Sequence, residues 1–148
     1  MILIEIPETL PISLDPSFIE QAATAVLKIG GAPANADLSI VLTTDLHLQQ
    51  LNQQFLGTDA PTDVLAFPAG DVDPDTDRPY LGDVIISVQR AQAQALDHPL
   101  EDELRLLVVH GVLHLLGHDH TEEGQKTIMW GVQREVLHQL GCEIVMPE

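Results

Sequence analysis

The chain has 148 residues, of which 45% are hydrophobic, and this composition excludes an intrinsically disordered protein. It is most simply one domain, over residues 1–148, that is large enough to bury a core. The formal net charge is −17, and the 6 Lys and Arg residues are scattered along the chain. Such a charge argues against a protein that binds nucleic acid through a broad basic surface.

The sequence also indicates where the protein works. Cys142 is the only cysteine, so no internal disulfide can form, which is typical of a reducing compartment. No uncharged apolar stretch reaches the length of a membrane span, and no basic segment followed by an apolar run opens the chain. We therefore expect a cytoplasmic protein without a membrane partner.

The first part of the chain is expected to alternate strands and helices. Asp15 and Pro16 are a typical N-cap and first helical residue, and Gly30 is a typical helix end. Thr44 or the residue after it can cap a second helix. The expected elements are a strand over residues 1–6, a helix over 16–29, a strand over 36–42 and a helix that ends near 57.

Helices dominate the second part. A short apolar strand over 64–67 is expected to end at Pro68, because proline inside a strand usually marks a sheet edge. A polar loop over 70–79 should follow. The remaining expected elements are a strand over 84–88, a helix from Ser87 to about Asp97, a helix from Pro99 to Leu116 and a helix over about 121–140. This order predicts an α/β (α+β) fold with one mixed sheet of about four strands.

One expected helix carries three histidines and a glycine at the spacing His-x-x-x-His-x-x-Gly-x-x-His. His110 and His114 lie one turn apart and share a helix face. Gly117 can take the left-handed conformation that ends a helix, so the chain can turn and bring His120 back. The helix is apolar nearly all round, and burial keeps imidazoles neutral. Three neutral imidazoles with one position left for water are what a catalytic zinc site requires.

We therefore predict that His110, His114 and His120 bind one zinc ion. A single histidine in an apolar helix is more often a core residue, but three at ligand spacing around a turn glycine favour a metal site. His118 and Asp119 are expected to support the ligands rather than to bind the metal.

The same ligand spacing occurs in the metzincin proteases, where a Glu directly after the first His acts as general base. In this chain that position is Gly111, which has no side chain. The sequence therefore has the metal ligands of a protease without its base.

Two more segments carry motifs. Leu51-Asn52 is followed by PTDVLAF over residues 61–67, and LGDVIIS occupies 81–87. Together with residues 110–120, they resemble the LN…PTDVLSF, LGDIxIS and HGxLHLxGxDH motifs of the YbeY family of bacterial endoribonucleases. The resemblance extends from about residue 45 to residue 135.

The resemblance implies a cytoplasmic α/β protein with zinc bound by His110, His114 and His120. It implies single-strand endoribonuclease action in 16S rRNA maturation and ribosome quality control, with rRNA and proteins of the small ribosomal subunit as partners. The family usually has an Arg, thought to be important for RNA cleavage, where this chain has Leu56. The general acid or base is not fixed by the sequence, and His118, Asp119, Asp63 and Asp83 are the candidates.

Two other functions remain open. A metallohydrolase of peptide or amide bonds shares the ligand spacing, although Gly111 counts against it. A non-catalytic ribosome-assembly factor agrees with Leu56 and with the acidic charge, because an acidic protein can dock on basic ribosomal proteins. Such a factor would hold a structural zinc, which usually has four protein ligands, so a fourth from His118, Asp119 or Cys142 would favour it.

Overall fold

The computed structural model of the chain describes residues 1–10, 12–72 and 74–142. Within these ranges four strands form one sheet in the order β1-β2-β4-β3. Their bounds are Ile2–Glu5 for β1, Asp37–Thr43 for β2, Val64–Val72 for β3 and Pro79–Ser87 for β4. The strands β1, β2 and β4 run parallel, and β3 pairs with β4 antiparallel. The prediction of a mixed sheet of about four strands is confirmed.

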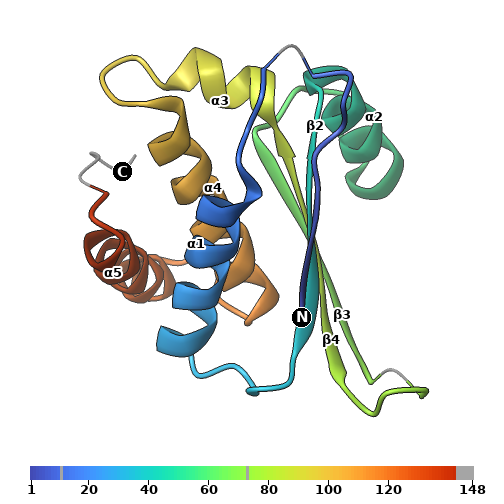
Figure 1. Ribbon diagram of the computed structural model, residues 1–148, viewed down its shortest axis with the longest axis vertical. Helices are drawn as coiled ribbons and strands as arrows, with labels where there is room; N and C mark the ends of the chain where they lie inside the picture. The colour runs from blue at the N-terminus through green and yellow to red at the C-terminus, as the bar shows by residue number, and fades with distance from the viewer. Residues whose placement is uncertain (11, 73, 143–148) are drawn as a thin grey trace.

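Five helices occur in the described ranges. Their bounds are Pro16–Ile29 for α1, Asp45–Leu56 for α2, Val88–Gln94 for α3, Leu100–Leu115 for α4 and Glu123–Gln139 for α5. In Figure 1, α1, α4 and α5 lie on one side of the sheet, and α2 lies on the other. The predicted α/β (α+β) fold class is confirmed. Residues 143–148 lie outside the described ranges, so the extent of the domain to residue 148 stays a prediction.

The helix starts follow local signals in the sequence. The carboxylate of Asp15 accepts a hydrogen bond from the N–H of Ser17 at 2.9 Å, which caps α1. Thr44 and Ser87 cap α2 and α3 through their hydroxyl oxygens. These caps confirm the predicted starts. The helix α3 ends at Gln94, earlier than predicted.

The hairpin of β3 and β4 differs from the prediction. The sequence predicts that the first strand ends at Pro68 and that residues 70–79 form a loop, and both expectations are wrong, because β3 continues to Val72 and β4 begins at Pro79. Proline is tolerated here because β3 is an edge strand, on which one row of N–H groups faces away from the sheet. A register shift between Pro68 and Asp71 absorbs the irregularity.

The helix α4 is central to the helical side of the sheet, where it contacts α1, α3, α5, β3 and β4. Ten of its 16 residues are buried, so the predicted burial of this helix is confirmed. Its fully buried residues, such as Leu104 and Leu113, belong to a single hydrophobic core with residues of α1, β2 and β4. No helix in the described part of the chain is long and apolar enough to cross a membrane.

Candidate metal centre

The histidine triad is assembled by the turn that ends α4. The N–H of Gly117 donates to the carbonyl of His114 at 3.0 Å. The N–H of the next residue, His118, donates to the carbonyl of Leu113 at 3.0 Å, which completes a Schellman motif. Gly117 has a φ of +97°, as the sequence predicts for a residue that must adopt a left-handed conformation. The chain then turns back and carries His120 to the end of the helix.

The three imidazoles meet at one point. One ring nitrogen from each of His110, His114 and His120 lies within 4.8 Å of the other two. The Nε2 atoms of His110 and His114 are 3.2 Å apart. Two nitrogens bound to one tetrahedral zinc at about 2.0–2.1 Å lie about 3.3 Å apart, so this pair already has the spacing of two ligands. The structure thus brings together the three residues that the sequence selects, and they could hold a metal ion.

Burial keeps the imidazoles of His110 and His114 in the form that binds metal. It lowers the pKa of His110 to about 4, with a further contribution from the charge of His114. The pKa of His114 is also lowered, first by burial and then by the charge of His120. Both rings are therefore neutral at pH 7. A neutral imidazole has a free nitrogen lone pair, which is what a metal ligand needs.

Residues of α5 hold the first ligand in place. The Nδ1 of His110 lies 3.1 Å from Oε1 of Gln133, which is 1% exposed. Nδ1 must donate this bond, because the amide oxygen can only accept, so Nε2 keeps its lone pair and faces His114. The ring of Trp130 contacts His110 and His120 edge to face, with centroid distances of 5.8 and 5.5 Å. Such outer partners fix the orientation of metal ligands.

Three of the candidate acid–base residues lie in different places around the triad, and the fourth, Asp83 in β4, accepts a hydrogen bond from the hydroxyl of Tyr80. Asp63 lies just before β3, and its carboxylate, which raises the pKa of His110 through its charge, accepts a bond from Nε2 of Gln94 at 3.4 Å. Asp119 accepts from the N–H of His120 at 2.7 Å, so it stabilises the turn. His118 supports the triad through its backbone, which hydrogen-bonds the ring of His114. Of the three, Asp63 lines the cavity beside the triad.

None of the three residues suggested as a fourth ligand, His118, Asp119 and Cys142, joins the triad in the described part of the chain. Within the described ranges, the group of side chains able to share a metal consists of His110, His114 and His120 alone. Cys142 is 4% exposed, and its Sγ donates to the carbonyl of Asp102, near the opposite end of α4. Three protein ligands are typical of a catalytic zinc site and one fewer than a structural site usually has.

Gly111 is packed where a protease would carry its base. A Cβ at this position would lie 2.5 Å from Cγ1 of Val84 in β4, so the backbone of α4 rests directly on the strand. The position after His110 therefore faces the core, and it has no room for a glutamate.

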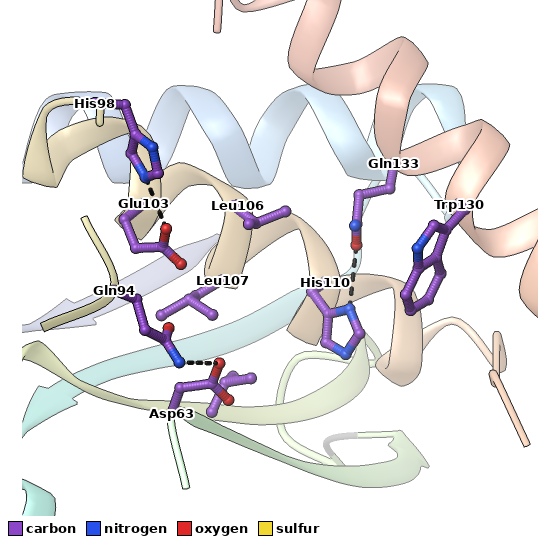
Figure 2. A pocket seen from close by; sticks show the side chains of 10 residues that line it. Asp63, Gln94, His98, Glu103, Leu106, Leu107, His110, Trp130 and Gln133 are labelled. Atoms are coloured by element: carbon purple, nitrogen blue, oxygen red, sulfur yellow. Dashed lines mark hydrogen bonds and ion pairs between the residues drawn. The ribbon is translucent and has the colours of Figure 1, made fainter. Parts of the chain in front are cut away.

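A cavity of about 470 Å³ opens beside the triad. Trp130 and the aliphatic residues Val64, Leu106 and Leu107 form its apolar walls. Its polar lining consists of Asp63, Gln94, His98, Glu103, His110 and Gln133. Figure 2 shows His98 and Glu103 at one end, and His110, Gln133 and Trp130 at the other.

Most of this lining is not predicted from the sequence. Gln94, His98, Glu103, Trp130 and Gln133 come from four separate segments that only the folded structure brings together. One signal was present: Glu103 is a charged residue inside an apolar helix, seven positions before His110 and therefore on the same face.

A mixed α/β fold with three histidines gathered at the end of a buried helix defines a candidate metal-dependent hydrolase. Residues 10–141 match the family described as Endoribonuclease YbeY, so the chain belongs to this family. The family predicted from the motifs is thereby confirmed. Its named members are endoribonucleases, which are hydrolases that act on the phosphodiester bonds of RNA.

Individual relatives agree with this assignment. Endoribonuclease YbeY of Roseiflexus sp. (strain RS-1) is 43% identical over 137 residues, which are 86% of this chain and 85% of the relative. The protein of the same name from Leifsonia xyli subsp. xyli is 39% identical over 90% of this chain and 92% of its own. The solution structure of TM1509 from Thermotoga maritima has a TM-score of 0.62 at 26% identity, over 95% of this chain and 89% of that chain.

Proposed function

We propose that this protein is a zinc-dependent endoribonuclease of the cytoplasm that cleaves single-stranded RNA, in 16S rRNA maturation and in ribosome quality control. The observation that carries the proposal is the meeting of three imidazoles beside an open cavity. Family membership supports the class of reaction. His110, His114 and His120 would hold the zinc ion.

The chain's own residues divide the remaining work. A bound zinc ion supplies Lewis-acid polarisation of a phosphoryl oxygen and makes water more acidic. Gln133 keeps the Nε2 of His110 free by accepting a hydrogen bond from its Nδ1–H. Asp63 is the carboxylate on the cavity wall beside His110, and we assign it the role of accepting a proton from water during hydrolysis.

The partners follow from the charge. A protein with a formal net charge of −17 is repelled by free RNA, so we propose that it docks on basic proteins of the small ribosomal subunit and meets rRNA there. Co-sedimentation with small subunits at moderate salt tests this proposal. Protein that stays in the supernatant would contradict it.

The two alternatives have different standing. The packing of Gly111 against Val84 disfavours a peptide hydrolase of the metzincin type, because its base has no place. An assembly factor without catalysis is favoured by one observation: Leu56, at the position where the family usually has Arg, is 61% exposed. Without this Arg, the chain lacks a cation that could hold a phosphate.

The decisive experiment measures cleavage of single-stranded rRNA fragments by zinc-loaded protein. We expect that His114→Ala and treatment with a chelator each lower the rate by more than about 100-fold. His138→Ala is the matched control, because His138 is exposed on α5. Cleavage that is unchanged in His114→Ala would contradict the proposal. Absence of cleavage together with co-sedimentation would favour the assembly factor.

A further inference from the structure

The cavity beside the triad has the size of a small-molecule site. Its volume of about 470 Å³ lies within the range of roughly 300–1,000 Å³ that is usual for such sites. It reaches from His110 to Glu103 along one face of α4. These residues are seven positions apart, which is about 10 Å at a rise of about 1.5 Å per residue. This length is comparable to that of one nucleotide from its phosphate to the edge of its base.

The charge of the cavity determines which part of a nucleotide can enter. Its described lining contains two carboxylates, those of Asp63 and Glu103, and no Lys or Arg. A phosphate would be repelled there. A base is uncharged, and the N–H groups on its edge can donate to carboxylates.

The walls suit a flat ring. Trp130 presents an indole at the end near the triad, and Leu106 and Leu107 form an apolar surface in the middle (Figure 2). Bases stack on aromatic side chains in proteins that bind single-stranded nucleic acid. The ring plane of a base can thus be held by contacts that leave its edge free.

The far end of the cavity holds fixed hydrogen-bonding groups. Glu103 is 5% exposed, and its Oε1 lies 2.7 Å from Nε2 of His98. Figure 2 shows its second oxygen turned toward the cavity. Gln94 contributes an amide, whose bond to Asp63 is long at 3.4 Å and can be exchanged for one to a ligand. A buried carboxylate held by a histidine is a rigid acceptor.

We propose that this cavity binds the base of the nucleotide next to the cleaved phosphodiester and prefers guanine to uracil. Guanine presents two adjacent N–H donors, which can share the oxygen of Glu103 that faces the cavity, and a carbonyl that can accept from Gln94. Uracil presents one N–H between two carbonyls, and these carbonyls would face the carboxylate. The inference rests on the proposed function for the position of the phosphate, but not for the binding of the base.

Trp130 makes base binding measurable without cleavage, because it is the only tryptophan in the chain. Its fluorescence is titrated with GMP and with UMP, corrected for absorption by the nucleotides. We expect GMP to bind about 5- to 150-fold more tightly than UMP. Equal quenching by both nucleotides, or quenching by neither, would overturn the inference.

Two variants locate the selectivity. Glu103→Gln should remove most of the preference for GMP, and Glu101→Gln, an exposed residue in the first turn of the same helix, should keep it. Gln94 is an exposed residue of α3, so Gln94→Leu should fold. It should weaken GMP binding because it removes the amide, and it tests the site even if Glu103→Gln fails to fold. A preference unchanged by Gln94→Leu and by a folded Glu103→Gln would contradict the assignment.

The outcome separates the two proposals. GMP-selective quenching without RNA cleavage would contradict the proposed function and leave the base site standing. Cleavage of mixed-sequence RNA with no base preference beside the cut, combined with equal quenching by GMP and UMP, would contradict the base site and leave the proposed function standing.

Discussion

The two ends of α4 use histidine in opposite ways. At the N-terminal end, His98 has its Nε2 occupied by Glu103 at 2.7 Å. At the C-terminal end, the Nδ1 of His110 donates to the neutral amide of Gln133, and its Nε2 faces His114. His98 is thereby anchored to Glu103, whereas the Nε2 atoms of His110 and His114 lie 3.2 Å apart, at the spacing of two ligands of one metal ion.

The largest expected effect concerns the thiol of Cys142, which lies near the N-terminal end of α4 and away from the triad. Burial raises the pKa of this thiol to about 12 from 9.0, and the charge of Asp102 adds to the effect. Because the pKa is raised, the reactive thiolate is much scarcer at neutral pH than at a free cysteine. Alkylation of native protein at pH 8 should therefore be at least about 100-fold slower than that of urea-unfolded protein.

Zinc loading should leave this alkylation rate unchanged, because Cys142 lies near Asp102 and not at the triad. Strong protection by zinc would mean that the cysteine is a ligand, and the three-histidine site would be wrong.

Gln133 tests whether the outer partner matters. Gln133→Leu removes the acceptor for Nδ1 of His110, so the ring loses its fixed tautomer. We expect zinc affinity to fall by about 10- to 100-fold in a competition titration with a chromophoric chelator. Gln139→Leu is the control, on an exposed position of the same helix. Equal affinities of the two variants would show that the contact with Gln133 has no role.

The sequence predicts one end of α4 better than the other. The triad is local in the chain, since an i, i+4 pair and a turn glycine place His110, His114 and His120 together. Trp130 and Gln133 reach the site because α5 packs against α4, and no local pattern encodes that packing. His98 and Glu103 are only five positions apart across the start of α4, but they belong to none of the motifs that the sequence shows.

The hairpin shows the same limit in another form. Pro68 and Gly70 are local strand breakers, and from the sequence they predict a loop. The strand continues because β4 offers a partner and because β3 is the sheet edge, which tolerates proline. Whether a strand lies at an edge is a property of the fold, so the sequence alone did not predict its length.

Gly111 tests the packing that excludes a protease base. Gly111→Ala places a methyl group against Val84 and should destabilise the protein by about 1–3 kcal/mol, measured from the urea midpoint. Gly131→Ala in α5 meets nothing within 4 Å and should stabilise the protein by about 0.4–1 kcal/mol. If both substitutions have the same sign, the close approach of α4 to β4 is contradicted.

Leu56 gives the smallest expected effect. Leu56→Arg places a cation on an exposed position at the end of α2, where the resemblance to the family implies an Arg. One added cation should raise the cleavage rate by roughly two- to tenfold at low salt, and less at high salt. Leu56→Gln, which is of similar size but neutral, should not change the rate. If Leu56→Gln raised the cleavage rate as much as Leu56→Arg, the added charge would not be the cause.

The coordination sphere of the loaded protein can be measured directly by X-ray absorption at the zinc edge. Three imidazole nitrogens and at least one further light-atom ligand from solvent are predicted, and His114→Ala should lose one imidazole. A sulfur ligand, or fewer than three imidazoles in the unmodified protein, would contradict the account.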